Sequence, residues 1–157
     1  MAESKRIEKF FKSILFPIDF SETSERAAPY AVSLARRYNA KLYVLHVVDV
    51  TDAAAGYYVS PISSEELEKE EAKGDKEMLR RFCARVCCGC EDEDMEAMVL
   101  SGVPHEVILK VVKEKDIDLI VMGASFPGGV DRLFFGSTAE KVMKGSSVPL
   151  FIIPPSK

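Results

Sequence analysis

The chain has 157 residues, a length typical of one domain with its own hydrophobic core. Apolar residues make up 47% of it and charged residues 29%, as in ordinary globular proteins. The net charge of −4 and the lack of a basic run argue against general binding to nucleic acid or to a membrane surface. The first residues are charged and have no long apolar stretch behind them. We therefore expect no signal peptide, no membrane span and a cytoplasmic location.

Five short apolar runs alternate with helical patterns along the chain. The runs are 13–18, 41–48, 95–100, 118–122 and 149–153. Strands that alternate with helices, with no hairpin signals between them, predict a parallel sheet covered on both sides. We expect an α/β fold with an open five-stranded parallel sheet and helices on both faces. It would form a single domain over residues 1–157, with an N-terminal extension at 1–12.

Two of the predicted helices have recognisable starts. The helix after the first strand has a face of small apolar residues, with Ser21 as its N-cap. Pro29 conflicts with this helix unless it lies near the first turns. A longer helix is predicted behind a capping box of Ser63 and Glu66. Its apolar stripe is predicted at Leu67, Gly74, Met78, Phe82 and Val86.

The four cysteines lie close together in the sequence. They are Cys83, Cys87, Cys88 and Cys90. A thiolate metal site requires pairs that converge from separate segments, and the sequence has neither a second cluster nor a nearby histidine. We interpret them as reduced, small, partly buried side chains at the end of a long helix, with a redox or metal role as the alternative.

Ligands of open parallel sheets bind beyond the carboxyl ends of the strands, where the strand order reverses. This rule selects Pro17, Ile18 and Asp19 after the first strand, residues 47–49 after the second, and residues 123–136 after the fourth. Asp19 could accept hydrogen bonds from an adenine amino group or a ribose hydroxyl, or it could simply cap the next helix. The backbone of Val47 could contact a base edge, or its side chain could belong only to the core.

A glycine-rich loop joins the fourth strand to the last helix. Glycines let backbone N–H groups approach a ligand closely, and a helix N-terminus with hydroxyl groups suits an anion. Gly136, Ser137 and Thr138 are therefore predicted to bind phosphate. The alternative is that Ser137 begins a capping box with Glu140 and only satisfies its own helix.

The sequence contains no clear catalytic group. Residues 123–127 partly match a nucleophile elbow around Ser125, but the following proline and two glycines prevent the helix that such an elbow needs. His46 is predicted within a strand and His105 in the first turn of a helix, so each is expected to be structural. We find no Walker lysine, no zinc-binding H-E-x-x-H motif and no triad.

Six segments carry a resemblance that extends from Ile14 to Ile153. They are ILFPIDFSETS at 14–24, LHVVD at 45–49, GVP at 102–104, DLIVMG at 118–123, FGSTAEKV at 135–142 and VPLFII at 148–153. Their order and spacing resemble those of single-domain universal stress proteins. The resemblance implies a Rossmann-type fold of the adenine nucleotide alpha-hydrolase-like kind. It also implies a stress-response module that binds ATP or AMP, with Mg²⁺ or Mn²⁺ on the phosphates, and has little or no catalysis.

The resemblance also implies which residues contact the nucleotide. Pro17, Ile18 and Asp19 would border the adenosine, Val47 would meet the base, and Ser137 with Thr138 would hold the phosphates. The complete set is Pro17, Ile18, Asp19, Val47, Met122, Gly123, Ala124, Phe126, Gly128, Gly129, Gly136, Ser137 and Thr138. The family commonly forms homodimers through its last strand, here Pro149 to Ile153, and an unpaired apolar edge would otherwise favour aggregation.

One position departs from the family pattern. That pattern is glycine, two residues, glycine, nine residues, then glycine with serine or threonine, and its middle glycine falls on Phe126. A phenyl ring there could obstruct the phosphates, although Gly128 and Gly129 could supply a shifted loop. The alternative function is therefore a nucleotide-independent dimeric interaction protein whose pocket is closed by Phe126. A nucleotide hydrolase ranks third.

Overall fold

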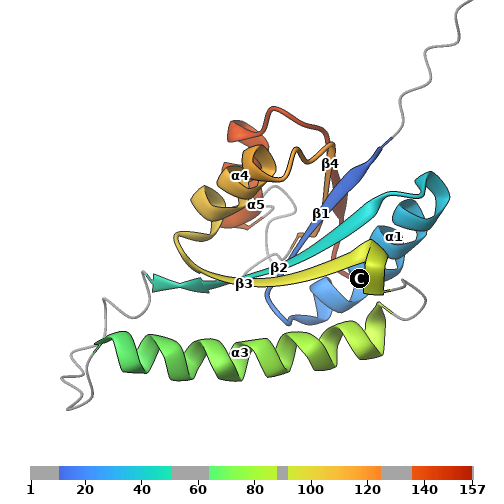
Figure 1. The fold of residues 1–157 in the computed structure, drawn as a ribbon. Helices are drawn as coiled ribbons and strands as arrows, with labels where there is room; N and C mark the ends of the chain where they lie inside the picture. Colours follow the sequence, from blue (N-terminus) through green and yellow to red (C-terminus); the bar gives the residue numbers. More distant parts are fainter. Residues whose placement is uncertain (1–10, 51–63, 88–91, 125–135, 157) are drawn as a thin grey trace, which may run out of the picture.

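The computed structural model describes residues 11–50, 64–87, 92–124 and 136–156. Its five strands form one parallel sheet in the order β3-β2-β1-β4-β5 (Figure 1). The strands are β1 (Ser13–Ile18), β2 (Lys41–Asp49), β3 (Met95–Gly102), β4 (Leu119–Gly123) and β5 (Leu150–Ile153). The predicted α/β fold with a five-stranded parallel sheet is confirmed.

The described helices cover both faces of the sheet (Figure 1). One face carries α1 (Glu22–Tyr38) and α3 (Ser64–Val86), and the other carries α4 (Pro104–Glu114) and α5 (Ser137–Gly145). A short 3-10 turn, η1 (Asp92–Asp94), precedes β3. Helices α1 and α3, which follow β1 and β2, lie on the first face. Helices α4 and α5, which follow β3 and β4, lie on the second. The strand order therefore reverses between β1 and β4, which is the position where ligands of such folds bind.

Successive residues of the central strands pack into two separate cores. On β1, Ile14 and Phe16 are fully buried in the core below α1 and α3, and Leu15 is fully buried in the core below α4 and α5. This is the environment that a continuous apolar run predicts for a strand of a parallel sheet. The carboxyl ends of the strands are thus held between two helical layers.

Helix α1 agrees with its predicted start but not with the expectation for Pro29. The hydroxyl of Ser21 accepts a hydrogen bond from the N–H of Ser24 at 3.2 Å, so Ser21 is the N-cap as predicted. Pro29 lies inside the helix, beyond its first turns. It is exposed there, and the Glu25 carbonyl that loses its helical partner can bind water instead.

The apolar stripe predicted for α3 is confirmed at Phe82 and Val86, which pack in or against the core, and is wrong at Gly74 and Met78, which are exposed. Leu67 lies outside the described side chains. Met78 is 49% exposed, and the buried side chains in the described part of α3 belong to Leu79, Phe82 and Cys83, with Cys87 buried just after the helix ends. Two cysteines therefore behave as small apolar residues, which confirms our interpretation for Cys83 and Cys87. Cys88, Cys90 and the capping box at Ser63 and Glu66 lie outside the described side chains. None of the described helices is long and apolar enough to cross a membrane.

Candidate functional site

A cavity of about 570 Å³ opens at the carboxyl ends of the strands, where the strand order reverses. Its walls come from the ends of β1, β2 and β4 and from the first turns of α1, α4 and α5. The lining residues are Pro17, Ile18, Asp19, Ser24, Leu45, His46, Val47, Val48, Asp49, Pro104, Ile108, Met122, Gly123, Gly136, Ser137, Thr138 and Ala139. The volume lies within the range of about 300–1,000 Å³ that small-molecule pockets occupy.

Most of the positions selected from the sequence meet at this cavity. The nine that line it are Pro17, Ile18, Asp19, Val47, Met122, Gly123, Gly136, Ser137 and Thr138. Ala124 does not line the cavity. It is buried, and its N–H donates to the carbonyl of Ile153 at 2.9 Å, so it belongs to the sheet. Phe126, Gly128 and Gly129 lie outside the described residues.

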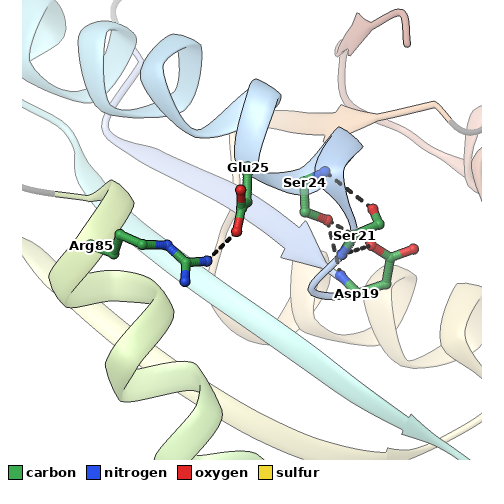
Figure 2. Close-up of polar contacts among 5 residues, drawn as sticks. All are labelled: Asp19, Ser21, Ser24, Glu25 and Arg85. Carbon is green, nitrogen blue, oxygen red and sulfur yellow. Dashed lines mark hydrogen bonds and ion pairs between the residues drawn. The ribbon is translucent and has the colours of Figure 1, made fainter. Parts of the chain in front are cut away.

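Asp19 lies in the turn between β1 and α1, where its side chain is exposed. Its Oδ1 accepts hydrogen bonds from the N–H of Ser21 at 3.0 Å and from the hydroxyl of Ser24 at 2.8 Å (Figure 2). The Ser24 oxygen also accepts from the N–H of Asp19 at 3.1 Å. Asp19 is therefore part of the turn that leads into α1. The same view shows Arg85 of α3 paired with Glu25, which links the start of α1 to α3.

The hydrogen bonds to Oδ1 also set the charge of Asp19. Packing of other atoms around the carboxyl raises its pKa, but hydrogen bonds from Ser21 and Ser24 outweigh this effect and bring the pKa below its ordinary value. The bonds from the Ser21 N–H and the Ser24 hydroxyl both fall on Oδ1. Asp19 therefore presents an ionised carboxylate, which accepts hydrogen bonds, at the cavity.

Helix α5 begins at the cavity without a side-chain cap. Its N-cap is Gly136, and none of the described side chains bonds to the N–H groups of its first turn. The alternative of a capping box that begins at Ser137 is wrong, because a capping box needs its hydroxyl at the N-cap and Ser137 is already the first helical residue. The uncapped N–H groups and the positive end of the helix dipole both attract anions. The cavity thus has an anion-attracting wall.

Eight lining residues are outside the set of nucleotide contacts that the resemblance implies, and they are Ser24, Leu45, His46, Val48, Asp49, Pro104, Ile108 and Ala139. Val48 and Asp49 belong to the range 47–49 that the end of the second strand selected, and Ser24 was noted only within the family segment at 14–24. Pro104 and Ile108 come from α4. The return of the chain across the sheet brings them to the cavity, and no local pattern in the sequence indicates this.

No separate metal centre is evident in the part of the chain that the structure describes. That part contains no group of three or more histidine, cysteine, aspartate or glutamate side chains able to hold a metal ion. Asp19 and Asp49 both line the cavity and could each contribute an oxygen. A divalent cation there would therefore need further ligands, such as the phosphate oxygens of a nucleotide.

Comparison with known proteins gives a consistent result along the whole chain. The model of the universal stress protein family matches residues 10–154. The universal stress protein MJ0531 of Methanocaldococcus jannaschii is 31% identical over 156 residues, which is 96% of this chain and 86% of that protein. The solved structure of MJ0577 from the same organism has a TM-score of 0.75 at 26% identity, and the match covers 95% of this chain and 99% of that one.

Two further solved structures with this fold contain nucleotides. One is a universal stress protein in complex with cAMP, with a TM-score of 0.66 and 22% identity over 93% of this chain and 98% of its own. The other, from Archaeoglobus fulgidus, is in complex with dAMP, with a TM-score of 0.62 and 22% identity over 92% and 98%. Because the family model matches residues 10–154 of the 157, this chain belongs to the universal stress protein family.

Proposed function

We propose that this protein binds an adenine nucleotide in the cavity, with little or no turnover. It would act in the stress response because nucleotide binding changes its conformation or its choice of partner. The observation that carries the proposal is that one cavity is lined both by the uncapped N-terminus of α5 and by the Asp19 carboxylate. The two groups have complementary uses. N–H groups bind a phosphate, and a carboxylate accepts hydrogen bonds from ribose hydroxyls or an adenine amino group.

Apolar walls give the proposed base a place to pack. The cavity is also lined by Val47 of β2, Met122 of β4 and Ile108 of α4. Binding pockets for small molecules commonly combine such walls with a few polar groups that fix orientation. The cAMP and dAMP complexes of proteins with the same fold support the choice of an adenine nucleotide. ATP and AMP are the candidates, with Mg²⁺ or Mn²⁺ carried on the phosphates.

Calorimetry with AMP, ATP with and without Mg²⁺, and adenosine tests this proposal. The decisive variant is Ser137→Asp, since an aspartate in the first turn of α5 favours the helix dipole but places a negative charge beside the phosphate. We expect it to weaken AMP binding by about tenfold or more and to leave adenosine binding within about twofold, because adenosine has no phosphate to repel. Ser137→Ala is the matched control for loss of the hydroxyl alone.

Two outcomes separate the alternatives. No binding heat at millimolar nucleotide in the wild-type protein, combined with binding by Phe126→Gly, would favour the nucleotide-independent protein whose pocket is closed. Phosphate release from ATP that is well above background and is lost in Asp19→Ala would favour the hydrolase. Binding without turnover supports the proposal.

We also propose that the protein forms a homodimer through β5. This strand is at one edge of the sheet, and Phe151 within it is 42% exposed. The Phe151 ring lies 6.0 Å from the ring of Tyr30 in α1, which is 47% exposed, so the two form an apolar surface beside the edge. An exposed apolar edge of this kind favours strand pairing with a second copy. Phe151→Lys should give monomers in sedimentation experiments. Met78→Lys changes an exposed residue of α3 far from β5 in the sequence and should leave the sedimenting species a dimer.

A further inference from the structure

His46 joins three parts of the fold at the carboxyl end of β2. Its Nδ1 lies 3.2 Å from the carbonyl oxygen of Ile18, the last residue of β1. Its Nε2 lies 3.8 Å from Oδ2 of Asp75 in α3, and the His46 side chain is only 14% exposed. Because a carbonyl oxygen can only accept, the contact with Ile18 requires a proton on Nδ1. His46 therefore donates to the residue that directly precedes Asp19.

The residue on the other side of Asp19 also depends on His46. Phe20 has a φ of 62°, in the left-handed region that bulky residues rarely adopt. Its ring centre lies 4.4 Å from that of His46 and 6.0 Å from that of Phe82 in α3. A strained backbone conformation persists only where its surroundings hold it. The rings of His46 and Phe82 supply that support.

We propose that His46 is the positioning residue of the nucleotide site. By donating to the Ile18 carbonyl and packing against the Phe20 ring, it holds the backbone on both sides of Asp19. The direction of the Asp19 carboxylate at the cavity follows from these two contacts, in addition to its own bonds with Ser21 and Ser24. The effect on ligand affinity rests on the proposed nucleotide binding, but the effect on the Asp19 turn does not.

Two backbone amides report on this turn without any ligand. The N–H of Ser21 donates to Oδ1 of Asp19, and the N–H of Asp19 donates to the oxygen of Ser24. Both bonds end on side chains, so both amides exchange with solvent when the turn opens locally. Their hydrogen-exchange rates therefore measure how firmly Asp19 is held.

The test compares two variants of His46 with a control. His46→Leu keeps an apolar side chain against Phe20 but removes the donor. His46→Asn places an amide N–H donor close to the position of Nδ1. His105→Leu, in the first turn of α4, removes a histidine that does not line the cavity. Exchange at Asp19 and Ser21 is measured by NMR without nucleotide, and AMP affinity is measured by calorimetry.

We expect His46→Leu to raise both exchange rates and the dissociation constant for AMP by about tenfold, because one partly buried hydrogen bond is lost. His46→Asn should stay within about threefold of wild type in each measurement, and His105→Leu should match wild type. Unchanged exchange in His46→Leu would overturn the proposal. So would a His46→Asn protein whose two amides exchange as fast as those of His46→Leu.

Two complications have defined outcomes. If His46→Leu does not fold, NMR signals of the ring nitrogens of wild-type His46 test the proposal instead. The proposal requires a proton on Nδ1, and a ring with its proton on Nε2 alone would overturn it. If the wild-type protein binds no nucleotide, the proposed function fails by calorimetry. The exchange rates at Asp19 and Ser21 still decide whether His46 holds the turn.

Discussion

Thr23, in the first turn of α1, lies directly against Gly123 at the end of β4. A Cβ added at Gly123 would lie 2.5 Å from Cγ2 of Thr23 and 2.7 Å from its carbonyl oxygen. The glycine that the sequence pattern associates with phosphate is therefore required by packing between a helix and a strand. This contact also places Ser24, the next residue of α1, beside the cavity where it bonds to Asp19.

The first prediction concerns this contact. Gly123→Ala should lower the free energy of unfolding by about 1–3 kcal/mol, because the backbone of Thr23 must move to admit a methyl group. Gly74→Ala is the matched control in α3, where an added Cβ meets no atom within 4 Å. It should raise the free energy by about 0.5–1 kcal/mol, as alanine favours a helix over glycine. Urea denaturation measures both, and a Gly123→Ala protein as stable as wild type would contradict the packing.

The sequence was sufficient for the fold because the central strands are simple. The apolar run that contains Ile14, Leu15 and Phe16 is buried on both faces, so its length and position define β1 without help from the rest of the chain. The alternation of such runs with helical patterns then leads to a parallel sheet, and the sheet to a cavity at its carboxyl edge.

The sequence was less informative where the surroundings decide the role of a residue. In α3, Met78 was expected on the buried stripe and is exposed, whereas Leu79, the next residue, is buried in the core. Ser137 has the sequence of a capping box, but the chain enters α5 through Gly136, one residue earlier. Each of these outcomes depends on how a helix is rotated or entered, and periodicity alone does not determine this.

A second prediction follows from the ionisation of Asp19. Its pKa is lower in the folded protein than in the unfolded chain, so the ionised carboxylate stabilises the fold above the ordinary carboxyl pKa of about 3.9. This contribution is lost as the pH falls below that value and through the lowered pKa of the folded state. Between about pH 5 and pH 3, the wild-type protein should therefore lose more stability than Asp19→Asn.

Urea midpoints at pH 6, 5, 4 and 3 check this difference, which should be small because the side chain is exposed. Ser24→Ala removes one of the bonds that lower the pKa of Asp19, so its pH dependence should lie between those of wild type and Asp19→Asn. Parallel curves for wild type and Asp19→Asn would show that the hydrogen bonds do not favour the ionised form.

The third prediction concerns the reactivity of the two buried cysteines. The hydrogen bond with Cys87 lowers the pKa of the Cys83 thiol, and burial opposes this effect only in part. A thiolate is the reactive form, but Cys83 is only 7% exposed and Cys87 only 2%. Iodoacetamide should therefore label both slowly in the native protein and quickly in urea, as measured by peptide mass spectrometry. Fast native labelling of Cys83 would mean that the end of α3 opens from the sheet.

The last prediction concerns the entry to α5. Gly136 has φ of 81° and ψ of 149°, a conformation close to one that is nearly exclusive to glycine. Gly136→Ala should therefore lower the free energy of unfolding by about 1–3 kcal/mol. It should also weaken AMP binding, because relief of the strain turns the first N–H groups of the helix away from the cavity. Ser137→Ala, at the next position, should change stability by less than about 0.5 kcal/mol. Thermal unfolding and calorimetry measure the two effects together, and equal stability of the two variants would show that the glycine conformation is not required.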